Sequence, residues 1–434
     1  MARWAWHGLT AGFLPNGYPS SVRSTYLSYA KWSAIGLVAG RVQSVLATQA
    51  ALFTIGLGAG AIPMAAATQW VLKDGVGHAG AIIYAASVNT RFDADAKRYR
   101  FHSTIALTAA DLIAVMMPLM PQHFFVMASL SSAMSSIANL AQVAARARIM
   151  SSFAVTGNLA DCVRAGQTQS KLMSIIGTGT GAGLSWVIGP EPYHVIGAMI
   201  PLAAVSCYAM HTSSCLVVMR TLNLQRCERV FADMLKEIPG DANCMALVPP
   251  TVRTPEEVAA METFTLGYRS ILPGRLYLQP LFAAKHPWGT QAKGEVAEMM
   301  ASLLGLDDVT RGAERAEQLY PRCASWHDGY VLVAGISSTG GAVVGLWHAA
   351  HTDPSTKLRA VWHASLARIR LAEQGGSIVA TQEEIRKTLA QIARITGDMW
   401  PHVEKAVVSA GWELQTVFLD GDGGCLDLND VKGE

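Results

Sequence analysis

The segment Leu112–Ala145, LIAVMMPLMPQHFFVMASLSSAMSSIANLAQVAA, contains 34 consecutive residues without Asp, Glu, Lys or Arg. A helix that crosses a bilayer needs about 20 mainly apolar residues, whereas a helix of a soluble protein keeps one polar face towards water. The segment is long enough for most of two spans. Pro118 and Pro121 predict the turn between them, because proline interrupts a helix. We therefore expect two membrane-spanning helices here, and residues 101–111 would complete the first.

Three further stretches of the N-terminal half contain no charged residue. They are 31, 19 and 28 residues long and cover residues 42–72, 172–190 and 192–219. Together with the first segment they predict five or six spans. We place these spans at residues 27–50, 52–72, 102–119, 122–146, 172–190 and 193–219. The boundary between the first two spans has two solutions: Gly56, Gly58 and Gly60 could hinge one long helix, or the break could lie near Thr48–Gln49.

The connections between the predicted spans differ in charge. The turns near residues 118–121 and 190–192 contain no Lys or Arg, whereas two other connections are basic. The basic residues are Lys73, Arg91, Lys97, Arg98 and Arg100 in one connection and Arg146, Arg148, Arg164 and Lys171 in the other. Such alternation is typical of membrane proteins, whose basic loops stay on the cytosolic or equivalent side. The alternative is a large soluble helical protein with a very apolar core.

The two halves of the chain carry opposite net charges. Residues 1–220 contain 14 Lys and Arg against 6 Asp and Glu, a net charge of +8. Residues 221–434 contain 20 against 26, a net charge of −6, so the two halves meet different solvents or partners. We therefore divide the chain into an N-terminal segment (1–25), a helical membrane domain (26–220), a helix and linker (221–256) and a soluble α+β domain (257–434).

The C-terminal half shows the pattern of a small α+β unit. Apolar, β-branched runs at residues 329–336 and 342–348 predict two strands, and the intervening SSTGG predicts a hairpin. We also expect an amphipathic helix at 221–238, a helix at 355–373, a strand at 377–380, helices over 381–410 and a strand at 412–419. The predicted fold class is thus mostly α, a polytopic helical membrane bundle followed by a small α+β domain.

Several functional classes lack the residues that they need. The seven cysteines form no CxxC pair, so neither a disulfide framework nor a zinc cluster is expected. The sequence contains no GxSxG, HExxH or Walker motif, and no basic stripe with interleaved aromatic residues. We therefore expect no catalytic residue, no metal, no cofactor and no nucleic-acid partner. Residues 1–19 lack a continuous apolar region, so no cleavable leader is evident.

Ionisable residues at the uncharged stretches are the first candidates for ligand binding or gating. Arg41 precedes one stretch and Asp111 begins another. Charges at or within a span are costly, so each is either an interfacial anchor or a residue that lines a polar cavity. Residues 73–78 (KDGVGH) follow an apolar span and predict a charged connector, which resembles the loop that latches neighbouring helices in major-facilitator transporters. The candidates in this connector are Lys73, Asp74, Gly75 and Gly77.

Two polar segments supply the other candidates. Residues 91–100 (RFDADAKRYR) predict an interfacial helix or, alternatively, a surface for anions or lipid headgroups. Residues 158–171 predict a polar connection before the next span, in which Asp161 could instead cap a helix. The candidates here are Asp93, Lys97, Arg100, Asn158, Asp161 and Gln169. The glycines of residues 177–183 (GTGTGAG) lie inside an apolar stretch, so they predict close helix packing rather than a phosphate-binding loop.

Several motifs in the same order resemble the root UVB-sensitive family. Residues 13–22 (FLPNGYPSSV) match its opening FLPxGYPxSV, and LATQA at 46–50, which contains Gln49, and WVLKDG at 70–75 match the next block. A DxxAKxWR-like element and a later block match at Asp93, Lys97, Arg100, Asn158, Asp161 and Gln169. The similarity extends over roughly residues 12–220.

The resemblance implies a membrane protein, often of plastids or mitochondria, that is linked to vitamin B6 homeostasis, UV-B tolerance and development. It implies no established reaction. The sequence departs from the family pattern at Ala81, where arginine is usual, and at Ser170, where glutamate is usual. These departures argue against a family ligand site in the connection that contains Ser170.

We therefore expect a non-enzymatic, transporter-like or scaffold protein in the lipid bilayer of a plastid, a mitochondrion or the endomembrane system. Six spans would resemble one half of a major-facilitator bundle, and a homo-oligomer, or a hetero-oligomer with a family paralogue, would supply the other half. One alternative is a soluble or peripheral interaction protein whose apolar stretches are covered by a partner. Another is an enzyme that binds vitamin B6 vitamers through Lys73 or Lys97.

Overall fold

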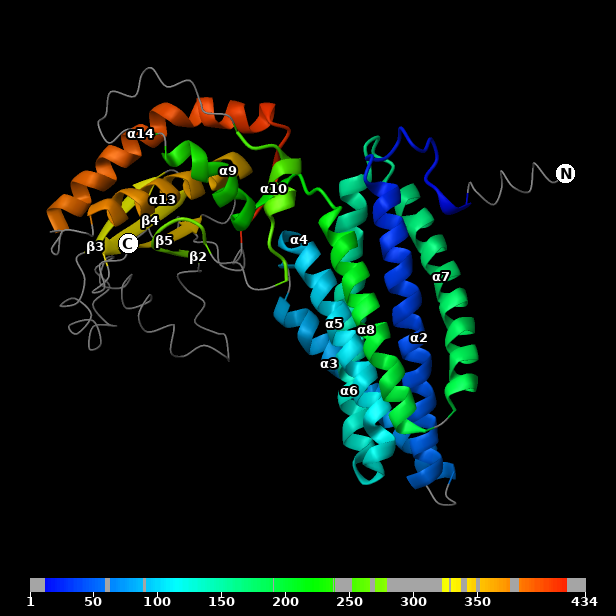
Figure 1. Cartoon of the computed structure of the whole chain (residues 1–434). Coiled ribbons are helices and arrows are strands. Elements are labelled where there is room, and N and C mark those ends of the chain that lie inside the picture. Colours follow the sequence, from blue (N-terminus) through cyan, green and yellow to red (C-terminus); the bar gives the residue numbers. More distant parts are fainter. Residues whose placement is uncertain are drawn as a thin grey trace, which may run out of the picture. The chain divides into compact units, whose positions relative to one another are not determined.

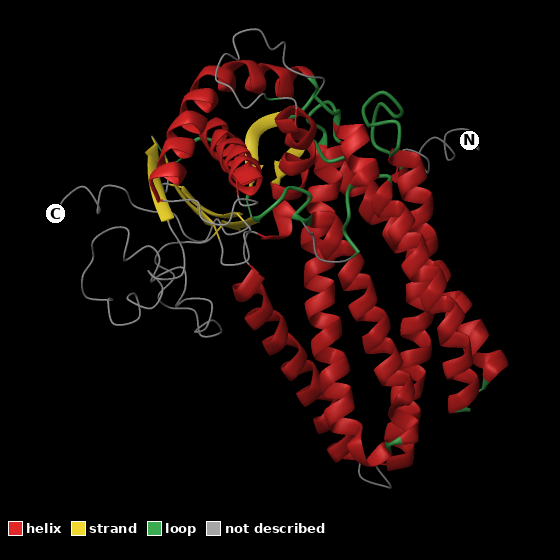
Figure 2. Cartoon of the chain, turned by 60° about the vertical axis from the view of Figure 1, so that its left-hand side comes forward, coloured by secondary structure: helices red, strands yellow, loops and turns green. Residues whose placement is uncertain are grey.

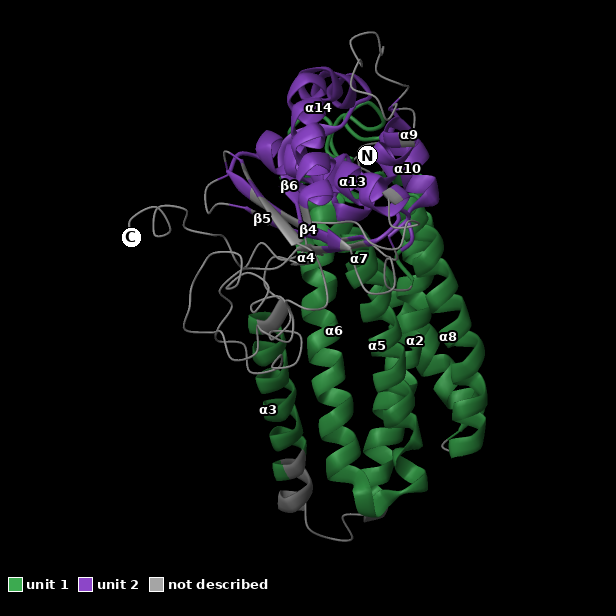
Figure 3. Cartoon of the chain, turned by 90° about the vertical axis from the view of Figure 1, so that its left-hand side faces the viewer, with its two compact units in different colours: residues 1–219, 264–266 green, residues 220–263, 267–434 purple. Residues whose placement is uncertain are grey.

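The chain forms two compact units and is mostly helical. The computed structural model describes residues 12–58, 63–88, 91–189, 191–236, 238, 252–265, 270–278, 322–327, 329–336, 342–348, 352–374 and 382–419. Unit 1 comprises residues 1–219 and 264–266, and unit 2 comprises residues 220–263 and 267–434 (Figure 3). The predicted fold class is confirmed to this extent: a helical N-terminal half precedes a smaller unit of helices and strands.

Unit 1 is a bundle of long helices that run side by side (Figures 1 and 2). The long helices are α2 (Tyr26–Gly58), α3 (Pro63–Val88), α5 (Ala96–Met116), α6 (Phe124–Phe153), α7 (Leu159–Ile188) and α8 (Pro192–Cys215). The short elements are α4 (Arg91–Ala94) and the 3-10 turns η1 (Met117–Leu119) and η2 (Pro121–His123). Helix α2 packs against α7 and α8, and α6 packs against α3 and α5.

The turn predicted at Pro118 and Pro121, within residues 112–145, is confirmed. Helix α5 ends at Met116, η1 and η2 carry the chain round, and α6 begins at Phe124. Four helical stretches of the described chain are long and apolar enough to cross a membrane by length and composition: residues 26–56, 96–119, 121–153 and 192–215. The count of five or six spans stays a prediction.

Two boundaries predicted in the first part of the bundle are wrong. Helix α2 continues through Thr48–Gln49 to Gly58, so no break occurs there or between the spans predicted at 27–50 and 52–72. A glycine such as Gly56 costs helix stability, but a single glycine does not by itself end a long helix of strong helix formers. The segment 73–78 is also no connector, because it lies within α3. The helix tolerates its charges because Lys73 Nζ lies 2.6 Å from Asp74 Oδ1.

Small residues allow two pairs of helices to approach closely. A Cβ atom at Gly177 of α7 would lie 2.7 Å from Arg41 Cβ and 3.0 Å from the carbonyl oxygen of Val38, both on α2. At Gly181, one turn further on, it would lie 2.9 Å from Val45 Cβ. The prediction that these glycines serve helix packing is confirmed, since α2 lies where their side chains would be.

Unit 1 exposes most of the large apolar side chains at the protein surface. Of those that the structure describes, all but Ile271 and Val408 belong to unit 1. Trp186 is 87% exposed and Ile175 is 71% exposed, whereas Leu46 and Met199 in the bundle interior are fully buried. Contact between so many apolar side chains and water is unfavourable. The outer surface of unit 1 would therefore be more stable in an apolar environment.

A short segment distant in sequence belongs to unit 1. Residues 264–266 cluster with the helical bundle although the chain on both sides of them belongs to unit 2. The ring of Phe264 is 5% exposed and its centroid lies 6.0 Å from that of Phe101 and 5.2 Å from that of His211. His102 Nε2 and the carbonyl oxygen of Thr265 are hydrogen-bonded at 2.9 Å. The segment therefore completes an aromatic cluster between α5 and α8.

Unit 2 is built on a four-stranded sheet. The described strands are β1 (Thr221–Asn223), β2 (Arg275–Leu278), β3 (Arg322–His327), β4 (Tyr330–Ile336), β5 (Ala342–His348) and β6 (Glu413–Phe418). The helices are α9 (Leu224–Lys236), α10 (Pro255–Met261), α13 (Pro354–Gln374) and α14 (Gln382–Ser409). The sheet order is β2-β5-β4-β3, in which only the β2–β5 pair is parallel, and β1 pairs separately with β6.

The sequence predicted part of this unit. The β4–β5 hairpin, the helix at 355–373 and the last strand are confirmed, and the helices expected over 381–410 form one helix, α14. The helix predicted at 221–238 is partly wrong, because residues 221–223 form β1, which pairs with β6. The strand predicted at 377–380 lies outside the described residues. Strands β2 and β3 were not predicted.

A buried ion pair joins two helices of unit 2. Arg368 of α13 and Glu228 of α9 approach to 2.6 Å, and both side chains are fully buried. Arg368 also donates hydrogen bonds to the carbonyl oxygens of Leu272 and Gly274, at 3.0 and 3.1 Å. Glu228 accepts a further bond from the hydroxyl of Ser270. The pair thus fixes the chain that precedes β2 against both helices.

Candidate ligand cavity in the helical unit

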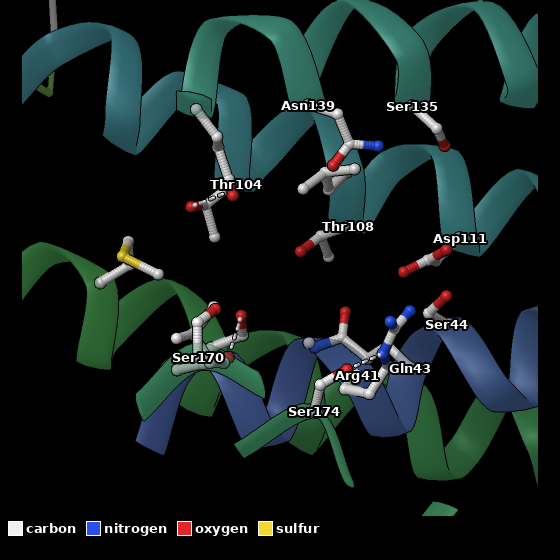
Figure 4. Close-up of a pocket in the computed structure, with 17 residues that line it drawn as sticks. Arg41, Gln43, Ser44, Thr104, Thr108, Asp111, Ser135, Asn139, Ser170 and Ser174 are labelled. Atoms are coloured by element: carbon white, nitrogen blue, oxygen red, sulfur yellow. Dashed lines mark hydrogen bonds between the residues drawn. The ribbon is translucent and has the colours of Figure 1, made fainter. Parts of the chain in front are cut away.

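A cavity of about 330 Å³ lies within unit 1, between five of its helices (Figure 4). It is lined by Gly36, Leu37, Gly40, Arg41, Gln43 and Ser44 of α2, Thr104, Leu107, Thr108 and Asp111 of α5, Ser135, Asn139 and Gln142 of α6, Ser170 and Ser174 of α7, and Ser206 and Met210 of α8. Arg41 and Asn139 are exposed whereas Gln43 and Thr108 are buried, so the cavity reaches from the surface into the interior.

The polar lining follows one face of each helix. Thr104, Thr108 and Asp111 of α5 are spaced i, i+4 and i+7, the interval that brings side chains to the same face. Ser135, Asn139 and Gln142 of α6 repeat this spacing. Sequence reasoning found Arg41 and Asp111 but missed these neutral residues. The signal was present, because a polar residue recurs once per turn within runs that are otherwise apolar.

Arg41 and Asp111 carry the two opposite charges of the cavity lining. Figure 4 shows the two side chains directed toward one another from α2 and α5. Arg41 Nε donates to Ser174 Oγ of α7 at 2.8 Å. Within the described part of the chain the two residues form no ion pair with each other. Both charged groups therefore remain available to a third partner.

Gln43 gives the cavity a buried acceptor. Its side chain is fully buried and its Nε2 donates to the carbonyl oxygen of Leu202 at 3.0 Å. Its Oε1 has no hydrogen-bond partner among the described residues. A buried polar atom without a partner is costly and uncommon in proteins, and a bound hydroxyl or N–H group would satisfy it.

Other predicted site residues lie together at the start of α7 and do not line the cavity themselves, although Ser170, next to Gln169, does. The segment 158–171, predicted as a connection, forms the first turns of that helix. Gln169 Nε2 donates to the carbonyl oxygen of Phe13 at 2.6 Å, and Arg164 Nη1 donates to that of Gly12 at 3.0 Å. Asn16 Nδ2 donates to Asp161 Oδ1 at 3.3 Å. We call this arrangement of residues 12–16 with Asp161, Arg164 and Gln169 the N-terminal clasp.

The clasp predicts a measurable effect on proteolysis. Gln169→Ala removes the hydrogen bond to the carbonyl oxygen of Phe13, worth about 1.4 kcal/mol at the upper end of the usual range, so residues 12–16 should open roughly ten times more often. Chymotrypsin should then cleave after Phe13 roughly ten times faster, as measured by mass spectrometry of the released peptide. Lys171→Ala, an exposed change on the same helix, is the control and should leave the rate unaltered. Equal rates for both variants would contradict a fastening role for Gln169.

Two of the four candidates of α3, Asp74 and Gly77, contact α6. Asp74 pairs with Lys73 and accepts a bond from Ser132 Oγ at 3.3 Å, and Lys73 Nζ lies 4.0 Å from the centre of the Trp70 ring. A Cβ atom at Gly77 would lie 2.6 Å from Ser132 Oγ, whereas one at Gly75 would meet nothing within 4 Å. None of these residues lines the cavity.

The remaining candidates are dispersed through the bundle. Gln49 accepts a hydrogen bond from Ser185 and thereby joins α2 to α7. Arg100 is buried and donates to Tyr29 Oη at 2.6 Å and to Ser33 Oγ at 2.7 Å, so it ties α5 to α2. The last three candidates lie elsewhere: Asp93 is exposed on α4, Lys97 is buried at the start of α5, and Asn158 precedes α7 with its side-chain amide unpartnered among the described residues.

Comparison with known proteins identifies the class of this chain. Residues 2–238 match the family model described as the vitamin B6 photo-protection and homoeostasis domain. The chain is 33% identical over 250 residues to protein root UVB sensitive 2, chloroplastic, of Arabidopsis thaliana, which covers 57% of this chain and 55% of the relative. It is 26% identical over 258 residues to protein root UVB sensitive 3 of the same plant, covering 59% and 56%.

A further relative shares a shorter region. RUS family member 1 of Dictyostelium discoideum is 30% identical over 167 residues, which are 38% of this chain and 32% of the relative. The chain thus spans about half the length, or less, of these curated relatives. No solved structure matches it. Because the family model covers more than half of the chain, and both the clasp and the cavity lie within that region, the protein belongs to the root UVB-sensitive family.

Proposed function

We propose that unit 1 spans a membrane and that its polar cavity binds a small solute, so that the protein is a non-enzymatic, transporter-like member of its family. The observation that carries this proposal is the cavity itself, in which Arg41 and Asp111 face each other among otherwise apolar helices. Ionisable side chains are costly within membrane helices, and they usually face a polar cavity or a solute pathway.

The surface of unit 1 supports insertion in a bilayer. Side chains such as Trp186 and Ile175 are exposed on the outside of helices that carry the cavity on their inside. This distribution is expected of a bundle whose outer surface faces lipid. We propose an organellar membrane, of a plastid or mitochondrion, or alternatively an endomembrane, and the name of the chloroplastic relative supports the first choice.

Vitamin B6 vitamers are the first solutes to test, because the family model is named for vitamin B6 photo-protection and homoeostasis. Covalent binding of a vitamer as a Schiff base needs a lysine amine. No lysine occurs among the described residues that line the cavity, and Lys73 is engaged by Asp74. The cavity therefore fits reversible binding of a solute better than Schiff-base catalysis.

Alkaline carbonate extraction tests the membrane half of the proposal. The tagged full-length protein should remain in the membrane pellet at high pH, because spans held by lipid are not released when electrostatic contacts are broken. A peripheral membrane protein serves as the extraction control and should move to the supernatant. Release of this chain with the control would favour a soluble or peripheral interaction protein, whose exposed apolar helices a partner covers.

Uptake into proteoliposomes tests the transport half. Vesicles that contain the protein should accumulate radiolabelled pyridoxine, and Arg41→Gln should reduce the rate at least about tenfold, the size of one lost charged contact. Membrane insertion without uptake of any vitamer would favour a scaffold role. A homo-oligomer, or a hetero-oligomer with a family paralogue, is part of the proposal, because six helices would make only half of a major-facilitator-like bundle.

A further inference from the structure

We infer that the cavity selects a zwitterionic solute, whose anionic group binds Arg41 and whose cationic group binds Asp111. The inference rests on the proposed function and names the class of solute for the same site. It starts from the observation that two opposite charges line one cavity and face each other without forming an ion pair. Two opposite charges that were free to move would approach each other and form an ion pair. The separation of Arg41 and Asp111 therefore needs a structural cause.

The stem of Arg41 is held in place by α7. The chain of α7 passes so close to α2 at Gly177 that an added Cβ atom would lie 2.7 Å from Arg41 Cβ and 3.2 Å from Arg41 Cγ. Further out, Arg41 Nε is bound to Ser174 Oγ, also on α7. The side chain is thus fixed at both ends of its stem by another helix. Its two terminal Nη groups are left as donors for a ligand.

The two charged groups have complementary chemistry. The terminal nitrogens of a guanidinium group form a planar fork that matches a carboxylate or a phosphate. The Asp111 carboxylate accepts from ammonium groups or protonated ring nitrogens. In the described part of the chain Asp111 accepts no hydrogen bond, so a cationic group of the ligand would meet it without competition.

The rest of the lining favours a solute without net charge. Of the described lining residues only Arg41 and Asp111 are charged, and the others are glycines, hydroxyl and amide residues, two leucines and a methionine. A simple anion would bind Arg41 but would leave Asp111 close by as a like charge, and a simple cation would meet Arg41 in the same way. A zwitterion pairs both charges. Gln43 Oε1 adds one buried acceptor for a hydroxyl or N–H group of the solute.

Three probes of nearly equal length test the inference: 4-aminobutyrate, butyrate and butylamine. Binding is measured by equilibrium dialysis on the full-length protein in detergent. We expect 4-aminobutyrate to bind at least tenfold more tightly than either singly charged probe. Asp111→Asn should remove the advantage over butyrate, and Arg41→Gln should remove the advantage over butylamine. Pyridoxamine, which carries an ammonium group together with a phenolate and no phosphate, is a second zwitterion, and it distinguishes a vitamer from an amino acid as the preferred source of the two charges.

Two variants serve as matched controls. Lys31→Gln removes a positive charge from an exposed position of α2, and Glu191→Gln removes a negative charge from an exposed position before α8. Neither residue lines the cavity, so both should bind the three probes as the unaltered protein does. Melting temperatures of all four variants show whether each is folded, and only folded variants are compared.

The outcomes separate this inference from the proposed function. Equal binding of zwitterion, anion and cation would overturn it, as would binding of neither zwitterion, or a preference that survives both Arg41→Gln and Asp111→Asn. Because dialysis in detergent needs no membrane, selective binding without uptake would uphold the zwitterion site and overturn transport. Uptake of butyrate that is unchanged in Asp111→Asn would uphold transport and overturn the zwitterion site.

Discussion

Replacing Arg368 by alanine is expected to lower the free energy of unfolding of unit 2 by about 3–5 kcal/mol. The guanidinium lies 2.6 Å from the Glu228 carboxylate, and both side chains are fully buried. Its removal leaves a buried negative charge without its counter-ion. The carbonyl oxygens of Leu272 and Gly274 lose their donors at the same time. An unpaired buried charge costs far more than an intact pair gains, so the loss should exceed that of an ordinary surface change.

Native-state hydrogen exchange of the full-length protein measures this loss directly, through the slowest-exchanging amides of α9 and α13. The control is Arg386→Ala, since Arg386 is 70% exposed and 4.0 Å from Glu383, and it should change the free energy by less than about 0.5 kcal/mol. The double variant Arg368→Met with Glu228→Leu should lose less than Arg368→Ala, because no charge remains unpaired. A loss below about 1 kcal/mol in Arg368→Ala would show that the pair does not hold the unit together.

Replacing Gly177 by leucine is expected to separate α7 from α2 and to destabilise unit 1 by about 3 kcal/mol, the upper end of the usual cost of overpacking. The new Cβ atom alone would lie 3.0 Å from the carbonyl oxygen of Val38, and backbone cannot turn aside as a flexible side chain can. The same change displaces Arg41, whose stem packs against Gly177. Binding of solutes in the cavity should therefore fall together with stability.

Gly179→Leu is the matched control for this substitution. It lies two residues away on the same helix, and a Cβ atom there would meet nothing within 4 Å. Leucine also favours helix over glycine, so this variant should be as stable as the unaltered protein or slightly more stable. The comparison uses melting temperatures in detergent, followed by helical circular dichroism. Equal melting temperatures for the two variants would contradict a close contact between α7 and α2.

The long helices of unit 1 could largely be predicted from the sequence, because runs without charge are long and prolines mark their ends. Pro118 and Pro121 did mark the turn between α5 and α6. The first boundary could not be placed in the same way. Glycine and a charged pair are compatible with a helix when a neighbour packs against them, as Ser132 of α6 does at Gly77. Only the position of α6 reveals this.

The residues that line the cavity were also predicted only in part. Arg41 and Asp111 stand out in sequence because a charge in an apolar run is costly. Their neutral neighbours, such as Thr108 and Asn139, do not change the average hydropathy of the run, and only their spacing distinguishes them. The clasp joins residues that are 145 or more positions apart, as between Asn16 and Asp161. Sequence alone gave no reason to bring these motifs together.

The segment at Phe264 has a consequence for how this chain can be divided. A polypeptide that ended at Met219 would contain every long helix of unit 1, but it would lack the ring that packs between Phe101 and His211. Its exposed aromatic cluster would then promote aggregation of a fragment that looks complete by sequence. A domain boundary drawn at Met219 would therefore remove one ring of this aromatic cluster.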